Sequence, residues 1–283
     1  MEEWNVRPYQ DAILKVFRVF QRVCEKHALR YFAIGGTAIG AVRHQGFIPW
    51  DDDFDVAMPR EDYDTLHRIA NDELPKNLKL FRGGESNDSP IFFSKILDVS
   101  EGMVEKLRDE TGLNIVTPPF IDVFVLEGVP DNVREINRWW KSRRMLRMCQ
   151  LYRYPESANV TKGASGKLRK RLARFAGAFL SLFYPATKSN DDMMLLFDEC
   201  ARRWSYNDSI MVAEPAFFRF RFSRIYHKSV FEPARTVKFE DGTICVPAKV
   251  EEYLTQFFGN YMEPPPIEQR IPEHIFRRTF SHA

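Results

Sequence analysis

The residues with the clearest chemical potential are acidic. Asp51, Asp53 and Asp55 stand at alternate positions in a run that contains four aspartates within five residues. Their negative charges repel one another, which favours binding of a cation. Hard oxygen ligands at this spacing suit Mg²⁺ or Mn²⁺, so the run predicts a divalent-metal site.

An extended conformation separates the acidic side chains of this segment from its apolar ones. Successive side chains of a strand point to opposite faces, so Asp53, Asp55 and Ala57 are expected on one face. Phe54 and Val56 are expected on the other, and both residue types favour half-buried strands. The pattern therefore predicts a strand whose polar row lies at the edge of a core.

Two other interpretations of the acidic run are weaker. Acidic runs are most often solvated loops, but mostly apolar residues flank this one, at 49–50 and 54–58. A calcium loop of the EF-hand type also has aspartates at its first, third and fifth positions. Such a loop needs Gly at its sixth position and Glu at its twelfth, where this chain has Val56 and Asp62.

Two glycines upstream supply the other half of the candidate site. Residues 31–34 predict a short apolar strand that leads into Gly35 and Gly36, and residues 37–42 can begin a helix. Glycines at such a place let the backbone approach a phosphate group, which the positive end of a helix also attracts. A Gly-Gly pair alone usually marks only a turn. Its position between a strand and the acidic segment favours phosphate binding.

Residues 35–63, GGTAIGAVRHQGFIPWDDDFDVAMPREDY, resemble the signature of the LicD family, which includes the fukutin-type enzymes and has the nucleotidyltransferase fold. The similarity continues in FSKIL at 93–97 and IDVFVLEGVP at 121–130. It returns towards the end of the chain, at 246–247, 253–254, 259–262, 264–265 and 274. The resemblance covers most of the chain and is least distinctive over 131–230.

The resemblance implies roles for three carboxylates. Asp53 and Asp55 are implied as catalytic residues and paired metal ligands, with Asp122 as the third. The residues around Asp122 agree, because it interrupts an apolar strand pattern and a buried Asp needs a partner or a metal. An Asp at a strand end can alternatively accept backbone N–H groups. Many relatives have Pro and Asp where this chain has Val125 and Glu127, which leaves those two positions without an assigned role.

The residues implied in binding an activated donor are Gly35, Gly36, Thr37, Arg43, His44 and Lys95. Lys95 lies in the otherwise apolar FFSKIL, where a buried ammonium is costly without an anion, and this favours a phosphate contact. His44 is equally compatible with a surface position on a helix. Trp50 is expected either to face a quaternary ammonium or to pack in the core, and Arg270 and His274 are weaker candidates for donor binding.

Hydrophobic periodicity predicts an α/β core in the first part of the chain. Helices are expected at 7–28 and 60–71, and strands at 31–34, 78–82 and 91–98. With 283 residues and 44% hydrophobic content, the chain can bury a full core. The resemblance implies an α/β (α+β) fold, in which helices flank a nucleotidyltransferase-like mixed sheet and the C-terminal region is mostly helical.

Three segments are expected: a catalytic core at 1–130, a helical and basic insert at 131–230, and a C-terminal segment at 231–283 that returns to the core. Within the insert, residues 167–183 combine five basic residues with an apolar end. Such a helix usually presents a solvated face, but it can also lie on an anionic bilayer or hold an acidic glycan.

Composition narrows the function classes. The 41 basic and 39 acidic residues leave a net charge of +2, which gives no indication of nucleic-acid binding. Four scattered cysteines without a CxxC pair favour reduced thiols over a disulfide framework or a zinc site. No apolar run approaches the ~20 residues of a membrane-spanning helix, and the N-terminus is too polar for a signal peptide. We expect a cytoplasmic protein, with peripheral contact at the inner face of the cell membrane as an option.

The resemblance implies a metal-dependent phosphotransferase. It would move phosphocholine or a similar alcohol phosphate from a CDP-activated donor, such as CDP-choline, to a hydroxyl of a cell-surface or lipid-linked glycan, as in lipopolysaccharide or teichoic acid. Neutralising the phosphate oxygens dominates such a transfer, and Asp122 is the candidate base for the acceptor hydroxyl. Two alternatives are a nucleotidyltransferase that acts on a small molecule and a non-catalytic glycan-binding module.

Overall fold

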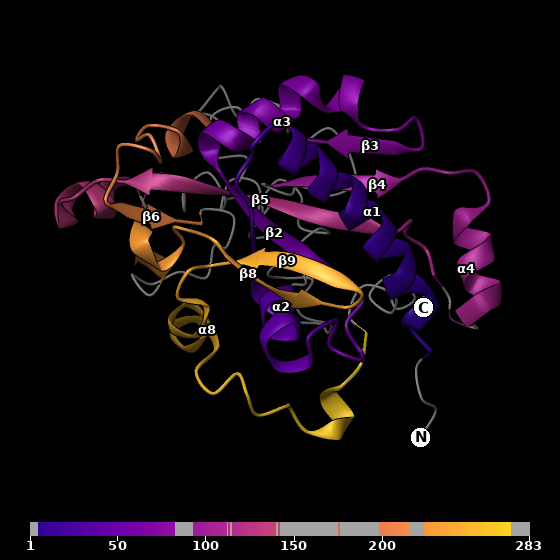
Figure 1. The fold of residues 1–283 in the computed structure, drawn as a ribbon. Helices are drawn as coiled ribbons and strands as arrows, with labels where there is room; N and C mark the ends of the chain where they lie inside the picture. Colours follow the sequence, from indigo (N-terminus) through magenta and orange to yellow (C-terminus); the bar gives the residue numbers. More distant parts are fainter. Residues whose placement is uncertain are drawn as a thin grey trace.

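The computed structural model describes residues 5–82, 93–111, 113, 115–139, 141, 175, 198–214 and 224–272. Its helices are α1 (Arg7–Lys26), α2 (Gly35–Ile39), α3 (Arg60–Glu73), α4 (Met103–Thr111) and α8 (Val250–Phe258). Its strands are β1 (Phe32–Ala33), β2 (Asp55–Pro59), β3 (Leu78–Phe81), β4 (Ser94–Asp98), β5 (Phe120–Val129), β6 (Met211–Ala213), β7 (Ile225–His227), β8 (Arg235–Phe239) and β9 (Gly242–Val246) (Figure 1). The shorter turns are the π-helical η1 (Gly40–His44) and the 3-10 turns η4 (Lys228–Val230) and η5 (Ile267–Gln269).

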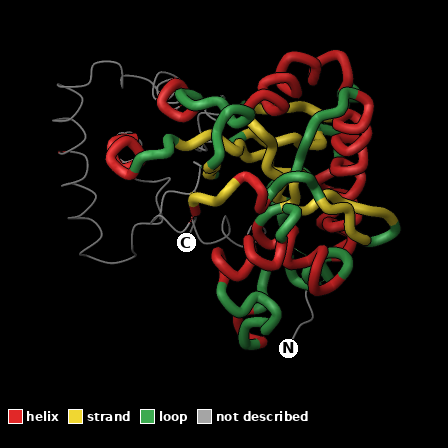
Figure 2. Tube along the Cα trace, turned by 60° about the vertical axis from the view of Figure 1, so that its left-hand side comes forward, coloured by secondary structure: helices red, strands yellow, loops and turns green. Residues whose placement is uncertain are grey.

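A mixed sheet lies at the centre of the described part of the protein. Strands β1, β2, β5, β4 and β3 follow one another across it, β6 pairs with β5, and β7 pairs with β6. β2 and β5 run parallel, whereas the other pairs of this sheet are antiparallel. β8 and β9 form a separate hairpin, and Figure 2 shows the helices arranged around the strands. The predicted α/β class, with a mixed sheet flanked by helices, is confirmed.

The first helix follows directly from its sequence. Proline at its N-terminus is tolerated because the first N–H groups of a helix have no partner within it. Ile13, Val16, Phe17 and Phe20 then recur at steps of three and four and are buried against the sheet. Each such side chain contributes roughly 1.5–3 kcal/mol of hydrophobic stabilisation. The helix predicted at 7–28 is therefore confirmed as α1, which crosses in front of the sheet in Figure 1.

The other predicted elements of the core are also present, with one difference in the acidic segment. The helix predicted at 60–71 is α3, and the predicted strands correspond to β1, β3 and β4. The acidic strand is shorter than predicted, because β2 begins only at Asp55. Ala57 is fully buried and does not extend a polar row, because β2 is an interior strand between β1 and β5 with both faces covered.

Aromatic packing anchors the acidic segment to the core. Phe54 is fully buried between two partly exposed aspartates, and its ring centroid lies 4.6 Å from that of Phe17 on α1. It also contacts Phe47 at 5.8 Å and Phe239, the last residue of β8, at 5.7 Å. Tilted and edge-on pairs of this kind add to the hydrophobic gain. The predicted alternation of polar and apolar side chains is thus present, although most of the run is not a regular strand.

Part of the predicted organisation lies outside the described residues. This holds for nearly all of the basic helix predicted at 167–183 and for His274. The division into three segments remains a prediction, and β6 and β7 of the main sheet fall within the segment 131–230. Cys24, Cys200 and Cys245 are free thiols.

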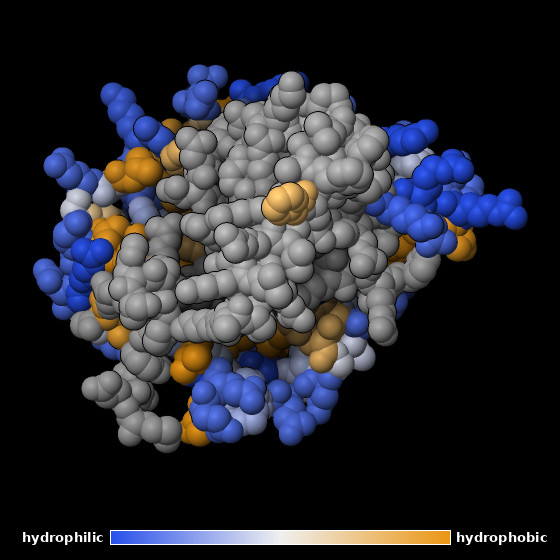
Figure 3. Space-filling model, turned by 180° about the vertical axis from the view of Figure 1, so that it is seen from behind, coloured by the Kyte–Doolittle hydropathy of each residue, from blue (hydrophilic) through white to orange (hydrophobic). Residues whose placement is uncertain are grey.

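The surface of the described part is mixed. Where its residues are visible from behind, most are hydrophilic, with hydrophobic side chains between them (Figure 3). Within the described residues, no helix is both long and apolar enough to cross a bilayer.

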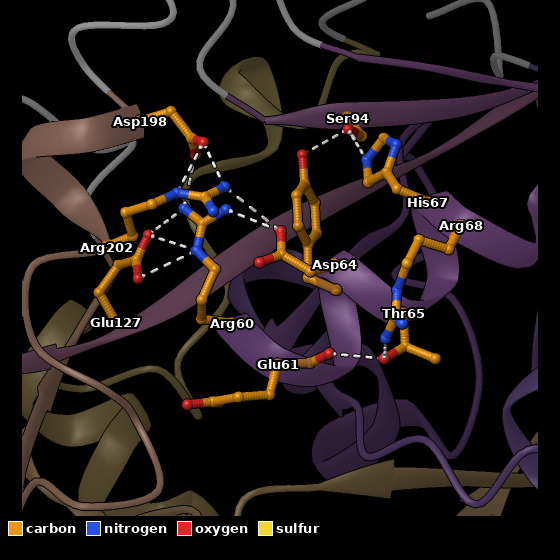
Figure 4. Close-up of polar contacts among 11 residues, drawn as sticks. Arg60, Glu61, Asp64, Thr65, His67, Arg68, Ser94, Glu127, Asp198 and Arg202 are labelled. Atoms are coloured by element: carbon orange, nitrogen blue, oxygen red, sulfur yellow. Dashed lines mark hydrogen bonds and ion pairs between the residues drawn. The ribbon is translucent and has the colours of Figure 1, made fainter.

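A buried ion pair joins α3 to β5 (Figure 4). Arg60 Nε donates to both carboxylate oxygens of Glu127, at 3.0 and 3.1 Å, and Arg60 Nη2 also contacts Oε1. The same Nη2 lies 2.8 Å from Asp198 Oδ1, and Arg202 donates to the other oxygen of Asp198. Because Glu127 is fully buried, this position has a structural role that the sequence pattern left unassigned.

A histidine lies on the same helix, close to the sheet (Figure 4). The Nε2 atom of His67 is 2.9 Å from Ser94 Oγ, and that hydroxyl is 2.5 Å from the hydroxyl of Tyr63. Burial lowers the pKa of His67 from 6.5 to about 4, and the charges of Arg82 and Arg60 act in the same direction. His67 is therefore neutral in the folded protein at pH 7.

The buried pair gives a first prediction. Arg60→Met leaves the Glu127 carboxylate buried without the guanidinium and should lower the free energy of unfolding by about 3–5 kcal/mol. The double variant with Glu127→Met should recover most of this loss, because an apolar pair replaces the ionic one. Urea denaturation measures both. Arg68→Met, on the exposed side of α3, is the control and should change stability by at most about 0.5 kcal/mol. Equal effects of Arg60→Met and Arg68→Met would contradict the role of the pair.

The histidine gives a second prediction, for pH dependence. The unfolded chain binds a proton at His67 as pH falls below 6.5, whereas the folded protein does so only near 4. The contribution of His67 to the free energy of unfolding should therefore be fully present above pH 6.5. It should be lost as pH falls from 6.5 to 4, by on the order of 2–3 kcal/mol. His67→Gln should lose correspondingly less over the same range in urea denaturation at pH 7 and 4.5. Parallel losses in the two proteins would exclude His67 as the cause.

Candidate active site

Three of the predicted site residues lie side by side on adjacent strands. Asp55 is opposite Asp122 in the parallel pair of β2 and β5, and Lys95 is opposite Asp122 in the antiparallel pair of β4 and β5. Residues opposite one another on neighbouring strands point to the same face of a sheet. The fold therefore brings Asp55, Asp122 and Lys95 together, as the resemblance implied for the two carboxylates.

Backbone hydrogen bonds hold the acidic segment on both sides. The N–H of Asp122 donates to the carbonyl of Phe54 at 2.8 Å, and the N–H of Ile34 donates to the carbonyl of Asp55 at 3.1 Å. The segment is therefore fixed between β1 and β5 before any side chain of the site is considered.

Two side chains outside the strands add to this. The N–H of Asp55 donates to Thr37 Oγ1 at 2.8 Å, and Gln10 Nε2 on α1 donates to the carbonyl of Asp51 at 2.8 Å. Thr37 thus positions a carboxylate in this structure, while its predicted contact with the donor remains a prediction.

Carboxylates cover the two glycines. Gly35 opens α2 with a φ of +57°, in the left-handed region that favours glycine, so the helix begins at the glycines and not after them. A Cβ atom on Gly35 would lie 2.8 Å from Asp55 Oδ2, and one on Gly36 would lie 2.7 Å from Asp51 Oδ2. Glycine is therefore required for the approach of the carboxylates. The N–H of Gly35 donates to the Tyr253 hydroxyl at 3.2 Å, so phosphate binding by this turn remains a prediction.

Negative charge accumulates at this place. Burial is the largest cause that raises the pKa of Asp51 well above its usual 3.8, followed by the charge of Asp53 and a hydrogen bond with it. Burial also raises the pKa of Asp55 well above that value, followed by the charges of Asp53, Asp122 and Asp51. A cation bound among these oxygens would offset the repulsion, so the donor set fits Mg²⁺ or Mn²⁺. Within the described residues, no three Asp, Glu, His or Cys side chains already converge as in a formed metal centre, and the metal remains a prediction.

Lys95 has a different anionic neighbour from the one predicted. Its Nζ lies 2.5 Å from Asp122 Oδ1 and 3.8 Å from the ring centroid of Phe120. Asp122 is itself almost fully buried. The ammonium is therefore compensated by a carboxylate of the chain, as a buried charge requires. A contact between Lys95 and a donor phosphate remains a prediction.

The other predicted cations gather around Trp50. Arg43 Nε donates to His44 Nε2 at 2.9 Å, and Arg43 Nη1 donates to the carbonyl of Tyr261 at 2.6 Å. The ring of His44 lies edge-on to Trp50, with centroids 6.4 Å apart, and Arg270 Cζ is 5.1 Å from the centroid of Trp50. We call Arg43, His44, Trp50 and Arg270 the cationic cluster. Arg43 and His44 are predicted donor-binding residues, and Arg270 is one of the two weaker candidates for donor binding.

Sequence reasoning missed two residues near the carboxylates. Glu214 directly follows β6, is 3% exposed, and has a pKa that burial raises to about 8. Its charge also contributes to the raised pKa of Asp55. No motif marks Glu214, whereas Tyr253 lies in a stretch that resembles the family tail and could have been identified from it.

Comparison with known proteins gives a family match over the part of the chain that contains the acidic segment. Residues 28–90, which contain both glycines and the acidic segment, match the model of the LicD/FKTN/FKRP nucleotidyltransferase domain. A lipopolysaccharide cholinephosphotransferase, LicD, of Haemophilus influenzae is 28% identical over 97% of this chain and 98% of its own length.

Two other similarities are confined to a shorter part of the chain. The human ribitol 5-phosphate transferase FKRP is 32% identical over 72 residues, which are 25% of this chain and 14% of that protein. An uncharacterized protein of Rickettsia prowazekii is 35% identical over 75 residues, or 24% of this chain and 28% of its own. The match over residues 28–90 and the similarity along nearly the whole chain confirm the resemblance to the LicD family that the motifs indicated.

Proposed function

We propose that the protein is a metal-dependent transferase that moves phosphocholine, or a similar alcohol phosphate, from a CDP-activated donor to a hydroxyl of a cell-surface glycan. One observation carries this proposal: the carboxylates of Asp55 and Asp51 lie against the backbone of Gly35 and Gly36, and Asp122 is opposite Asp55 on the neighbouring strand. Acidic side chains that raise one another's pKa oppose folding unless a cation offsets their repulsion. Similarity to a lipopolysaccharide cholinephosphotransferase and to a ribitol 5-phosphate transferase supports a phosphotransferase that acts on glycans.

In this proposal Asp53, Asp55 and Asp122 hold Mg²⁺ or Mn²⁺. Bound there, the cation would neutralise phosphate oxygens of the donor, which is the main requirement of phosphoryl chemistry. Thr37 keeps Asp55 in place through the backbone contact at 2.8 Å. Asp55 and Asp122 are fixed by strands β2 and β5, which suits a reaction that depends on positioning.

The acceptor hydroxyl must also lose a proton. Asp122 is the proposed base, because it is a carboxylate on the same face as Asp55. Its ion pair with Lys95 holds the side chain in one orientation. Transfer of the proton to an Asp122 oxygen would weaken that ion pair, so Lys95 is proposed to stabilise the charged carboxylate between turnovers.

Identification of the product tests the proposal. Purified protein, Mg²⁺, a panel of CDP-alcohols and the organism's own glycan should yield CMP and a glycan that is heavier by one alcohol phosphate in mass spectrometry. With CTP or ATP and small-molecule acceptors, transfer of a nucleoside monophosphate would instead identify a nucleotidyltransferase. Binding of glycan with no new product under any of these conditions would support a non-catalytic module.

The metal gives a third prediction, which does not depend on turnover. Because Asp55→Asn relieves repulsion among the carboxylates, this variant should melt about 2–4 °C above the wild type in EDTA, as expected for roughly 1 kcal/mol. Mg²⁺ should raise the melting temperature of the wild type but not that of Asp55→Asn. The control is Asp131→Asn at an exposed position, which should respond to Mg²⁺ as the wild type does. If Mg²⁺ raised the melting temperature of Asp55→Asn as much as that of the wild type, Asp55 would be excluded as a ligand of the cation.

The proposed base gives a fourth prediction. Asp122→Asn should lower kcat about 10²-fold or more with little change in KM, because it removes an interaction that is made in the transition state. Initial rates over a range of donor concentrations separate the two constants, and thermal melting verifies the fold. An increase in KM at unchanged kcat would identify Asp122 as a residue that positions the donor.

A further inference from the structure

The cationic cluster is made from two parts of the chain that are far apart in sequence. Arg43 and His44 belong to η1, which continues directly from α2, while Arg270 follows η5 near the end of the described residues. Arg43 binds the carbonyl of Tyr261, a residue 218 positions away, and Arg270 Nε binds the carbonyl of Pro265. The long-range contact fixes Arg43, whereas Arg270 is held by a local hydrogen bond and by its place over the ring of Trp50.

The two guanidiniums concentrate positive charge. Burial lowers the pKa of Arg43, and the charge of Arg270 lowers it further. Among the described residues, no Asp or Glu forms an ion pair with Arg43 or Arg270. By contrast, the partly buried Arg30 and the buried Arg60 do have carboxylate partners. Two neighbouring guanidiniums without a carboxylate partner among the described residues therefore offer a place for an anion to bind.

The other two members of the cluster, His44 and Trp50, carry no negative charge that could compensate the guanidiniums. Burial and the charge of Arg43 lower the pKa of His44, so its ring is neutral at pH 7 and accepts the N–H of Arg43. Trp50 has the guanidinium of Arg270 over its ring. A quaternary ammonium at this place would meet like charge, so the cluster suits the phosphate part of a donor better than a choline.

The cluster also borders the carboxylates. Trp50 directly precedes Asp51, whose carboxylate lies against Gly36. A ligand that reaches from the carboxylates to the cluster must carry negative charge at its cluster end. Guanidinium groups bind phosphate oxygens through pairs of parallel hydrogen bonds, and two of them match a diphosphate.

We propose that Arg43 and Arg270, supported by His44 and Trp50, form the subsite for the diphosphate of a nucleotide donor. This inference rests on the proposed function in one respect, namely that the donor is a nucleoside diphosphate derivative. It assigns Arg270, a residue outside the family domain at 28–90, to donor recognition. Both arginines are binding residues here, and the proton transfer at Asp122 does not involve them.

Calorimetric titration of the full chain with CDP, cytidine and inorganic pyrophosphate gives the fifth prediction. Arg270→Gln should weaken binding of CDP and of pyrophosphate about 10-fold or more, as expected for loss of a charge-assisted contact, and leave cytidine unchanged. Arg270→Lys should recover part of the loss, because it restores the charge without the paired geometry. Arg68→Gln, an exposed arginine on α3, should bind all three probes as the wild type does.

The second arginine and a vesicle assay complete the test. Arg43→Gln should also weaken CDP binding. Because this variant loses the contact with Tyr261, thermal melting must first show that it folds. If Arg43→Gln does not fold, the result with Arg270→Gln decides the question. CDP affinity in Arg270→Gln equal to that of the wild type would overturn the proposal. If Arg270→Gln no longer pelleted with phosphatidylglycerol vesicles but bound CDP as the wild type does, the proposal would likewise be overturned. The cluster would then be assigned to lipid headgroups.

The subsite and the proposed function can be refuted independently of each other. CDP binding that depends on Arg270 in a protein that transfers no alcohol phosphate would support the subsite and refute the proposed function. Transfer of the alcohol phosphate with a CDP affinity that is unchanged in Arg270→Gln would support the function and refute the subsite.

Discussion

The crowding of Asp51 and Asp55 against the backbone of Gly35 and Gly36 is the constraint on which the rest of the structure depends. Like charges in a poorly hydrated place oppose folding, so the segment that carries them must be fixed by interactions strong enough to overcome the repulsion. The fully buried ring of Phe54 and the hydrogen bonds to β1 and β5 supply these interactions. The glycines complete the arrangement, because any side chain at their positions would collide with a carboxylate oxygen.

Side chains of opposite charge lie at the two ends of the candidate site. Arg43 and Arg270 give one end a positive charge, while the carboxylates of residues 51–55 lie at the adjoining end. Such a division matches a substrate with an anionic group on one side and a site for a cation on the other. It also separates two kinds of basic residue: Lys95 is compensated by Asp122 within the sheet, whereas Arg43 and Arg270 have no such carboxylate among the described residues.

The elements of the core could be predicted from periodicity, and the neighbours of individual side chains could not. Steps of three and four in α1 and the apolar pattern of β5 are local properties of the sequence, and both predictions are confirmed. Ala57 was assigned to a polar face because the pattern does not reveal that β2 is an interior strand. Lys95 was recognised as a charge that needs an anion, but the register that puts it opposite Asp122 depends on strand pairing. Only the family resemblance predicts that Asp122 lies near Asp55, and no sequence motif marks Glu214.

The contacts between the first and last parts of the chain have a consequence for biosynthesis. The Gly35 N–H reaches Tyr253 across 218 residues, Arg43 reaches Tyr261 across the same separation, and the Phe47 N–H reaches Glu240 across 193. A chain emerging from the ribosome at about 5–20 residues per second exposes the acidic segment for roughly ten seconds or more before these partners exist. These contacts therefore form only after residues 240–261 have been synthesised.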